Sequence, residues 1–337
     1  MTRVLVTGGA GFLGSHFVRR WLRSNRGPVV NVDALTYAGS EARLADVNGD
    51  SAYTFLRADV CDRGEMERIM AESRPGFVVH FAAESHVTRS EAAGERFWRT
   101  NVDGTRTTLE AAAAGGVSRF VHISTDEVYG PIAEGAFTED QKEPGEGRAT
   151  SPYARSKAVA DDVARSFGKG LEVVVLRATN CFGPWQFPEK AFARWTTRAL
   201  SGRPIPVWGD GLYVRQWLHA EDLARAIEVV LDVASPETVY NVGPRHWPEV
   251  TNLSLATWLL TYLGLPRERL VLTAYDRPDH DRRYAVDPGR IEALGWRAGD
   301  LWKGLSATVD WYRDSEHWWR PLVAEAESIY SDEQARV

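Results

Sequence analysis

Short hydrophobic runs alternate with amphipathic stretches through the first half of the chain. The runs that predict strands are Arg3–Val6, Val29–Val32, Tyr53–Leu56, Phe77–Phe81, Arg119–Ile123 and Leu171–Leu176. Helical spacing of apolar residues in the intervals predicts helices, among them 15–22, 101–114 and 151–167. Strands that alternate with helices are typical of a parallel sheet with helices on both faces. We therefore expect an α/β fold with a doubly wound parallel sheet.

The alternation loosens after about residue 185, where Pro, Gly and Trp become more frequent and short elements replace the strand–helix units. We predict two domains. Residues 1–180 would form a nucleotide-binding domain, and residues 181–330 would form a smaller lobe with some segments returning to the first domain. Because no Gly/Ser-rich linker separates them, we expect the two parts to pack together.

The composition excludes several classes of function. The formal net charge of −6 over 337 residues, without a dense Lys/Arg run, argues against a nucleic-acid partner. No apolar run reaches the ~20 residues that span a bilayer, so no membrane partner is expected. Cys61 and Cys181 form no disulfide framework, and no Cys/His cluster has metal-ligand spacing. We expect a cytoplasmic protein without a metal.

A glycine loop follows the first predicted strand. Gly9, Gly11 and Gly14 satisfy the G-x-G-x-x-G pattern, and Gly8 extends it. Glycines let backbone N–H groups approach a pyrophosphate, and the helix that follows points its positive end at that charge. The position between a strand and a helix makes this a specific signal for a Rossmann-type dinucleotide site.

The strand after the glycine loop ends at Asp33, and the next ends near Asp59. A carboxylate at Asp33 can accept hydrogen bonds from both ribose hydroxyls and would repel a 2′-phosphate, so NAD is favoured over NADP. Asp59 would meet the adenine end. The candidate cofactor-binding residues are Gly8, Gly11, Phe12, Leu13, Gly14, Asp33, Asp59, Val60, Ala82, Ala83, Tyr153 and Lys157.

Candidate chemistry begins with Tyr153 and Lys157, which are four residues apart and so share one helix face. A tyrosine is a poor base near neutrality because its usual pKa is about 10. We expect Lys157, together with a nicotinamide ring, to lower that pKa. Tyr153 could then take the proton of a substrate alcohol while hydride leaves the same carbon.

Two carboxyl groups, Asp126 and Glu127, directly follow Ser124-Thr125 at the end of the fifth predicted strand. Two carboxyls in a closed pocket cannot both ionise cheaply, which pushes their pKa values apart. One can then act as an acid and the other as a base. Such a pair predicts proton transfer beyond simple oxidation of an alcohol.

These residues resemble the extended short-chain dehydrogenase/reductase superfamily and, more closely, the dTDP-glucose 4,6-dehydratase family. The blocks that carry the resemblance span most of the chain and are 31–39, 80–87, 124–130, 151–153, 183–190 and 277–284. The Thr-Asp-Glu triplet at 125–127 and Gln-Phe-Pro-Glu-Lys at 186–190 are specific to that branch.

The resemblance implies a reaction in three stages. Tyr153 takes the C4 hydroxyl proton of a hexose while hydride leaves C4, and Thr125 hydrogen-bonds the C4 oxygen. Glu127 then removes the C5 proton while Asp126 protonates the leaving C6 hydroxyl. Hydride returns to C6 and Glu127 returns a proton to C5, giving a 4-keto-6-deoxy sugar.

The resemblance also implies a site for the nucleotide diphosphate, mainly in the second lobe. Asn180, Arg215, Asn252 and Arg277 would contact phosphate, for which arginine suits because its planar fork binds phosphate bidentately. Pro206 and Trp208 would pack against the base. The full set of candidate substrate residues is Ser85, Arg89, Thr125, Asn180, Lys190, Pro206, Trp208, Arg215, Asn252, Arg277 and His280.

Departures from the family pattern fall at Thr88, Cys181, Gln216 and Asp279. All lie near the sugar or nucleotide, so the base and the sugar stay open. A nucleotide-sugar 4-epimerase or a decarboxylase would need Tyr153 and Lys157 without the acid pair. A non-catalytic NAD-binding protein would be free to lose Tyr153 or Lys157. The family commonly dimerises through helices corresponding to 101–114 and 151–167, so a homodimer is expected.

Overall fold

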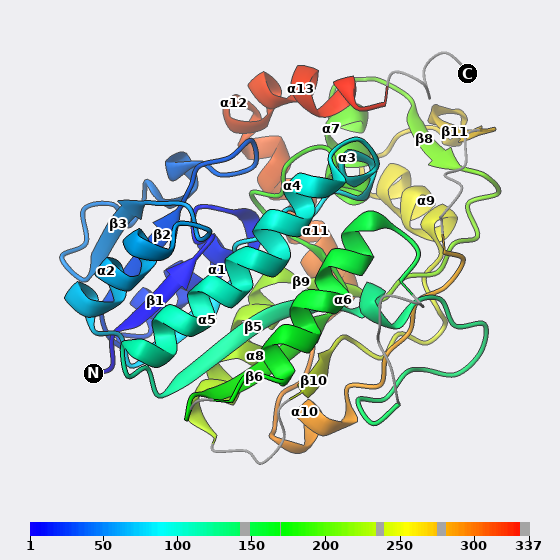
Figure 1. Cartoon of the computed structure of the whole chain (residues 1–337). Coiled ribbons are helices and arrows are strands. Elements are labelled where there is room, and N and C mark those ends of the chain that lie inside the picture. Colours follow the sequence, from blue (N-terminus) through cyan, green and yellow to red (C-terminus); the bar gives the residue numbers. More distant parts are fainter. Residues whose placement is uncertain (142–148, 169, 234–238, 275–280, 331–337) are drawn as a thin grey trace.

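The computed structural model describes residues 1–141, 149–168, 170–233, 239–274 and 281–330 (Figure 1). Seven parallel strands form one sheet in the order β10-β6-β5-β4-β1-β2-β3. They are β1 (Val4–Thr7), β2 (Val29–Asp33), β3 (Tyr53–Arg57), β4 (Phe77–His80), β5 (Arg119–Thr125), β6 (Glu172–Ala178) and β10 (Val239–Val242). The predicted α/β class is confirmed, and all six predicted strands are present within two residues at each end.

Helices cover both faces of this sheet, and α5 and α6 cross in front of it in Figure 1. One face packs on α1 (Phe12–Arg23) and α8 (Ala220–Asp232), and the other on α2 (Arg63–Ser73), α5 (Gly104–Ala114) and α6 (Pro152–Arg165). Alternate strand residues point to opposite faces, so Val4 and Val6 join the first core while Leu5 joins the second. Along the chain, α3 (Val87–Ala92), α4 (Gly94–Trp98) and a π-helical turn, η2 (Arg99–Asp103), lie between β4 and α5.

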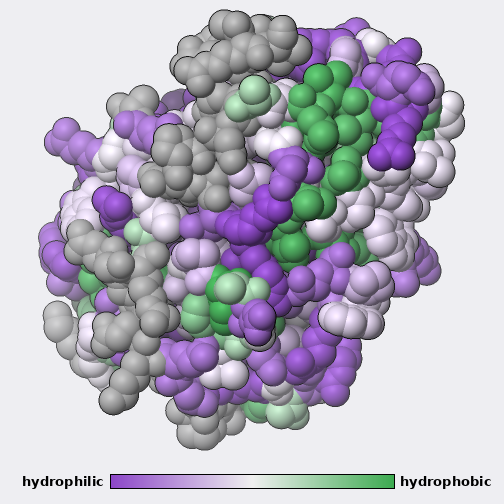
Figure 2. All heavy atoms as spheres, turned by 90° about the vertical axis from the view of Figure 1, so that its right-hand side faces the viewer, coloured by the Kyte–Doolittle hydropathy of each residue, from purple (hydrophilic) through white to green (hydrophobic). Residues whose placement is uncertain are grey.

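The remaining elements build a smaller layer with its own hydrophobic core, in which Trp195 and Trp217 are buried. Its strands are β7 (Asn180–Phe182), β8 (Ile205–Trp208), β9 (Trp217–His219) and β11 (Leu270–Thr273), and they pair as β7–β9 and β8–β11. Its helices are α7 (Ala191–Leu200), α9 (Asn252–Tyr262), α11 (Leu301–Asp314), α12 (Glu316–Trp319) and α13 (Val323–Ser328). On the side where β8, β11 and α9 lie, hydrophobic side chains gather beside polar ones (Figure 2).

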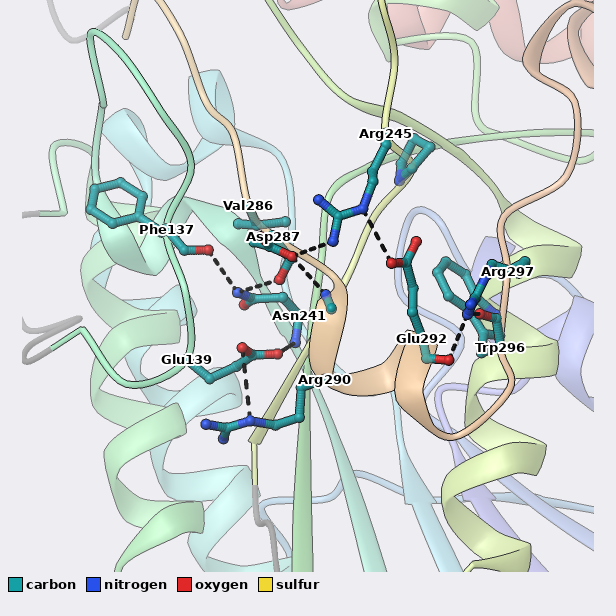
Figure 3. A network of polar contacts seen from close by, with 12 residues as sticks. Phe137, Glu139, Asn241, Arg245, Val286, Asp287, Arg290, Glu292, Trp296 and Arg297 are labelled. Atoms are coloured by element: carbon teal, nitrogen blue, oxygen red, sulfur yellow. Dashed lines mark hydrogen bonds and ion pairs between the residues drawn. The ribbon is translucent and has the colours of Figure 1, made fainter.

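Segments from the second half of the chain return to the main sheet. Strand β10 pairs with β6, and α10 (Gly289–Ala293) follows it on the same edge. Asn241 in β10 joins these parts: its side chain donates to the carbonyl oxygens of Phe137 (3.0 Å) and Asp287 (3.3 Å), and its backbone N–H donates to Glu139 (2.8 Å). Figure 3 shows this network, which fixes the edge of the sheet next to β6.

None of the helices in the described ranges has the length and apolar character that a membrane crossing requires.

Candidate active site

A cavity of about 410 Å³ opens at the carboxyl ends of β1, β2, β4 and β5. The strand order reverses between β1 and β4, which is where doubly wound sheets bind ligands. All twelve candidate cofactor-binding residues line it: Gly8, Gly11, Phe12, Leu13, Gly14, Asp33, Asp59, Val60, Ala82, Ala83, Tyr153 and Lys157. The fold thus brings together residues that are far apart in the sequence, such as Gly8 and Lys157, which are separated by 149 positions.

The glycine loop is held by close backbone contacts. Gly8 has φ +71°, and a Cβ there would lie 2.7 Å from the Ala82 nitrogen. A Cβ on Gly14 would lie 2.4 Å from the Gly8 carbonyl oxygen. Helix α1 begins at Phe12, no side chain caps its first N–H groups, and Gly11, Phe12 and Leu13 at this end line the cavity. This cradle fits a pyrophosphate.

Asp33 lines the cavity at the end of β2. Its carboxylate accepts hydrogen bonds from the backbone N–H groups of Ala10 (3.0 Å) and Leu35 (2.8 Å). Burial raises the pKa of Asp33, and the two backbone bonds oppose that rise. Arg43, which the sequence reasoning missed, lines the same cavity, but its buried guanidinium donates to the carbonyl oxygens of Ala10, Ala38 and Trp185. The Arg43 guanidinium is therefore engaged by backbone carbonyl groups, which leaves it less able to bind a 2′-phosphate.

Asp59 lines the same cavity and is held by two partners. It accepts hydrogen bonds from the backbone N–H of Cys61 (2.9 Å) and from the guanidinium of Arg99 (2.8 Å). Arg99 also lines the cavity and comes from the π-helical turn η2. The sequence analysis did not predict Arg99, because an isolated π turn has no periodicity that could reveal it.

The candidate catalytic residues meet at the end of β5. Thr125 ends the strand, the 3₁₀ turn η3 (Asp126–Tyr129) carries the two acids, and α6 brings Tyr153 and Lys157. The Thr125 hydroxyl donates to Asp126 Oδ1 and accepts from the Glu127 backbone N–H, both at 3.3 Å. All five residues line the large cavity.

The expected lowering of the Tyr153 pKa is not found in the protein alone. Burial first, and then the Glu127 carboxylate, raise the pKa of Tyr153. The Lys157 ammonium donates to the Ile123 carbonyl oxygen at 2.7 Å, and burial lowers the pKa of Lys157 to about 8. The prediction joined Lys157 to a nicotinamide ring, so it stays a prediction for the protein with its cofactor, whereas in the chain by itself burial dominates.

One of the two acids, Asp126, has the raised pKa that the sequence analysis expects of one member of such a pair. Asp126 is 2% exposed. Burial, and then the charge of Glu127, raise the pKa of Asp126 to about 7. A protonated Asp126 beside Glu127 is therefore available near neutral pH, which suits an acid and a base working on neighbouring atoms.

A buried polar network supports this turn from behind. Ser124 donates to Asp161 (2.9 Å), and Arg177 donates to both oxygens of Asp161 (2.8 and 2.9 Å) and to the Tyr129 hydroxyl (2.7 Å). The Tyr129 hydroxyl in turn donates to Asn241 (2.8 Å). The network joins β5, η3, α6, β6 and β10, so the strand ends that carry Thr125 and the acids are fixed to the helix that carries Tyr153.

A second cavity of about 180 Å³ adjoins the first, and Glu127, Asn180, Glu189 and Lys190 line both. It also contains the predicted residues Pro206, Trp208, Arg215 and Asn252. Arg215 is 7% exposed, and its guanidinium donates to the Asp281 carbonyl oxygen at 2.7 Å. Burial lowers the pKa of Arg215, while the negative charges of Glu127 and Asp126 favour its charged form. Glu127 thus stands where the large cavity meets a smaller one that is also lined by Arg215 and Lys190.

Comparison with known proteins assigns the family. A model of the NAD dependent epimerase/dehydratase family matches residues 4–243. The chain belongs to this family.

Several members of the epimerase/dehydratase family resemble the chain over nearly its whole length. The dTDP-glucose 4,6-dehydratase of Streptomyces niveus is 44% identical over 98% of both chains. The structure of a dTDP-glucose 4,6-dehydratase from Streptomyces venezuelae, with NAD and dTDP bound, is 44% identical with a TM-score of 0.89, covering 95% of this chain and 99% of that one. A UDP-glucose 4-epimerase of Thermotoga maritima, 30% identical, has a TM-score of 0.82 and covers 93% and 99%.

One predicted substrate residue, Arg89, stands apart from both cavities. Ser85 lines the large cavity, whereas Arg89 lines neither cavity. The Arg89 guanidinium pairs with Glu189 (2.9 Å) and lies 3.9 Å from the centre of the Tyr37 ring. Arg277 and His280 lie outside the described residues.

The sequence analysis missed several residues of the second cavity, notably Arg194, Tyr284 and Tyr330. Arg194 lies on α7. The spacing of apolar residues predicts that such a segment is helical, but it does not show which of its polar residues face a cavity. No group of three or more His, Cys, Asp or Glu in the described part of the chain could hold a metal ion.

Proposed function

We propose that this member of the epimerase/dehydratase family is an NAD-dependent nucleotide-sugar 4,6-dehydratase that converts dTDP-glucose, or a closely related nucleotide hexose, to the 4-keto-6-deoxy sugar. The observation that carries the proposal is the buried Asp126 beside Glu127, with a pKa near neutrality, next to Thr125 and Tyr153. An epimerase or a decarboxylase has no use for an acid and a base at neighbouring carbons. The relatives named dTDP-glucose 4,6-dehydratases support the same reaction.

The cradle around the large cavity fits NAD: the glycine loop takes the pyrophosphate, Asp33 the adenosine ribose and Asp59 the adenine end. NAD held there would supply the hydride acceptor for C4 and, once reduced, the hydride donor for C6. Tyr153 removes the proton of the C4 hydroxyl, and the Thr125 hydroxyl hydrogen-bonds the C4 oxygen. Lys157 supplies positive charge on the same helix face.

The C4 ketone makes the C5 proton acidic, and Glu127 removes it. Asp126 donates its proton to the C6 hydroxyl, so that water leaves. Glu127 later returns its proton to C5. Tyr153 releases the C4 hydroxyl proton to solvent and Asp126 takes one up, so both groups return to their starting states. One water is lost in total, the oxidation at C4 is matched by the reduction at C6, and no second substrate is consumed.

The second cavity would hold the nucleoside diphosphate. Arg215 and Lys190 offer positive charge, Asn180 and Asn252 offer amide groups, and Trp208 and Pro206 offer apolar surface. Ser85 would contact the sugar from the large cavity. We assign Arg277 and His280 to the substrate on the resemblance alone. Residues 1–180 would then mainly bind NAD, and residues 181–330 mainly the nucleotide sugar.

The reaction type can be tested by supplying the purified protein with NAD and a panel of nucleotide hexoses and measuring product masses. We expect dTDP-glucose to lose one water without net reduction of NAD. A product of unchanged mass with inverted C4 would instead identify a 4-epimerase. Loss of carbon dioxide from a sugar acid would identify a decarboxylase.

The pH dependence follows from the raised pKa of Asp126. We expect the rate of water loss to fall as pH rises through about 7, because Asp126 must be protonated to act as the acid. Single-turnover rates with dTDP-glucose, measured about one pH unit below and above this value, should show that decline. Asp126→Asn should be slower at every pH and should lack the decline. The same decline in Asp126→Asn would assign it to another group.

We also propose that the enzyme acts in the cytoplasm as a homodimer. Cys61 and Cys181 are both free thiols, which suits a reducing compartment. The dimer contact would use α5 and α6, by analogy with the family. Sedimentation at the monomer mass of 37.6 kDa would exclude the dimer.

A further inference from the structure

The end of the described chain folds back over the second cavity. Helix α13 lies beside α7 (Figure 1), and the two are joined by charge. Glu327 on α13 pairs with Arg194 (3.2 Å) and Arg198 (2.8 Å) on α7. Glu327 is 8% exposed, so these pairs are shielded from water and hold the C-terminal segment in one place.

Tyr330, just beyond α13, joins three parts of the cavity wall. Its hydroxyl donates to the Glu189 carbonyl oxygen at 2.5 Å and lies 3.3 Å from His86 Nε2. The Arg194 guanidinium stands 3.7 Å from the ring centre. The ring also meets Trp208 edge to face, with centres 6.1 Å apart. All of these residues line the second cavity, and Tyr330 lines it with them.

The chemistry of this corner suits a flat heteroaromatic ring. Trp208 and Tyr330 offer aromatic surface at an angle of 65°, while Arg215 and Lys190 supply positive charge elsewhere in the same cavity. A base can lie along one ring with its edge against the other, while the diphosphate reaches the cations. In a cavity of about 180 Å³, the size of a group on the edge of that base decides how well it packs.

We propose that Tyr330 forms the wall of the base-binding part of the second cavity and helps to select the base of the nucleotide. The C-terminal segment thereby completes a site whose other members all lie between residues 86 and 284. This inference rests on the proposed function, because it takes the second cavity as the nucleotide site. Loss of the wall should weaken binding of the base and reduce discrimination between bases that differ by a methyl group.

Calorimetric titration of dTDP and UDP into the NAD-loaded protein tests this proposal. The two nucleotides differ at the base by the 5-methyl group and at the ribose by the 2′-hydroxyl, so dUDP serves as a third probe that isolates the methyl group. For Tyr330→Ala we expect the Kd of dTDP to rise about tenfold to a hundredfold. The ratio of the dUDP and dTDP constants should move towards one. NAD content should stay at the wild-type level.

Tyr330→Phe keeps the ring and loses the hydrogen bond to Glu189, so it should keep the preference for one base. Tyr312→Phe is a matched control, since the Tyr312 hydroxyl also donates to a backbone carbonyl oxygen at 2.5 Å, that of Gln186, but Tyr312 lines neither cavity. It should leave all three nucleotide constants unchanged. If Tyr330→Ala does not fold, Tyr330→Leu, which fills the core without a flat face, takes its place.

The proposal is overturned if the Tyr330→Ala or Tyr330→Leu variant keeps the wild-type constants, or if every constant rises by one common factor. It is also overturned if the wild type binds dTDP and dUDP equally. A wild type that prefers one base yet releases no 4-keto-6-deoxy product would contradict the proposed dehydratase reaction alone. A dehydrating wild type whose variants keep the preference would contradict the role of Tyr330 alone.

Discussion

Glu127→Gln is expected to slow release of the 4-keto-6-deoxy product by about 10²–10⁴-fold, the usual contribution of a positioned general base. Glutamine keeps the shape of Glu127 and its place in η3, but it cannot take the C5 proton. Oxidation at C4 uses Tyr153 and Thr125, so it should persist. Two measurements check this: deuterium uptake at C5 from D₂O, which should stop, and the absorbance of reduced nicotinamide in a single turnover, which should appear.

Glu139→Gln provides the control for that variant. Glu139 lies in the segment that follows η3 and accepts the Asn241 backbone N–H at 2.8 Å, a bond that glutamine can keep. It lines neither cavity, so its variant should turn over normally. Continued deuterium uptake at C5 in Glu127→Gln would show that another group is the base. Loss of C4 oxidation as well would show that Glu127 acts earlier than proposed.

The predictable parts of the site are those whose functional residues lie close together in the sequence, within one turn, strand end or helix. The glycine loop requires Gly8 and Gly14 because backbone approaches within 3 Å of where a Cβ would stand. Tyr153 and Lys157 share a helix face, and Asp126 follows a strand end. In each case the spacing in the sequence is also the geometry of the site.

The parts that were missed depend on contacts across long stretches of sequence. Strand β10 has only four residues, and its place beside β6 is decided by pairing with residues 64 positions earlier, as in Val239 with Val175. Tyr330 reaches the cavity through Glu189, which lies 141 residues away. Such partners leave no periodic pattern, because either member alone resembles an ordinary buried residue.

The direction of the Tyr153 pKa in the chain by itself could not be predicted, for a different reason. The residue types are right for a tyrosine base, but the sequence gives no measure of burial. Desolvation in the folded chain raises this pKa, and Glu127 raises it further. The same two causes raise the pKa of Asp126, where the shift assists its proposed role. Burial in this pocket therefore keeps Asp126 protonated near neutral pH, whereas Tyr153 needs positive charge beside it before it can act as a base.

Asp161→Asn is expected to lower the free energy of unfolding by about 3–5 kcal/mol, because it leaves a buried charge without its counter-ion. Asp161 is fully buried, and Arg177, its bidentate partner, is 1% exposed. The variant also weakens the bond from Ser124, which adjoins Thr125, so turnover should fall even where the protein remains folded. Denaturant unfolding and the rate of product release measure the two effects.

Asp162→Asn is the matched control for Asp161→Asn. Asp162 is the next residue on α6, and both it and Asp161 pair with Arg165. The Asp162 side chain is 48% exposed, however, and exposed pairs contribute about 0–1 kcal/mol. The double variant Asp161→Leu, Arg177→Met removes both buried charges and should be more stable than Asp161→Asn alone. If Asp161→Asn instead matched Asp162→Asn in stability, water must reach Arg177, and the network would not hold the acid pair rigidly. If the double variant regained stability but not turnover, the charged network would be needed to position Thr125 and the acids, and packing alone would not suffice.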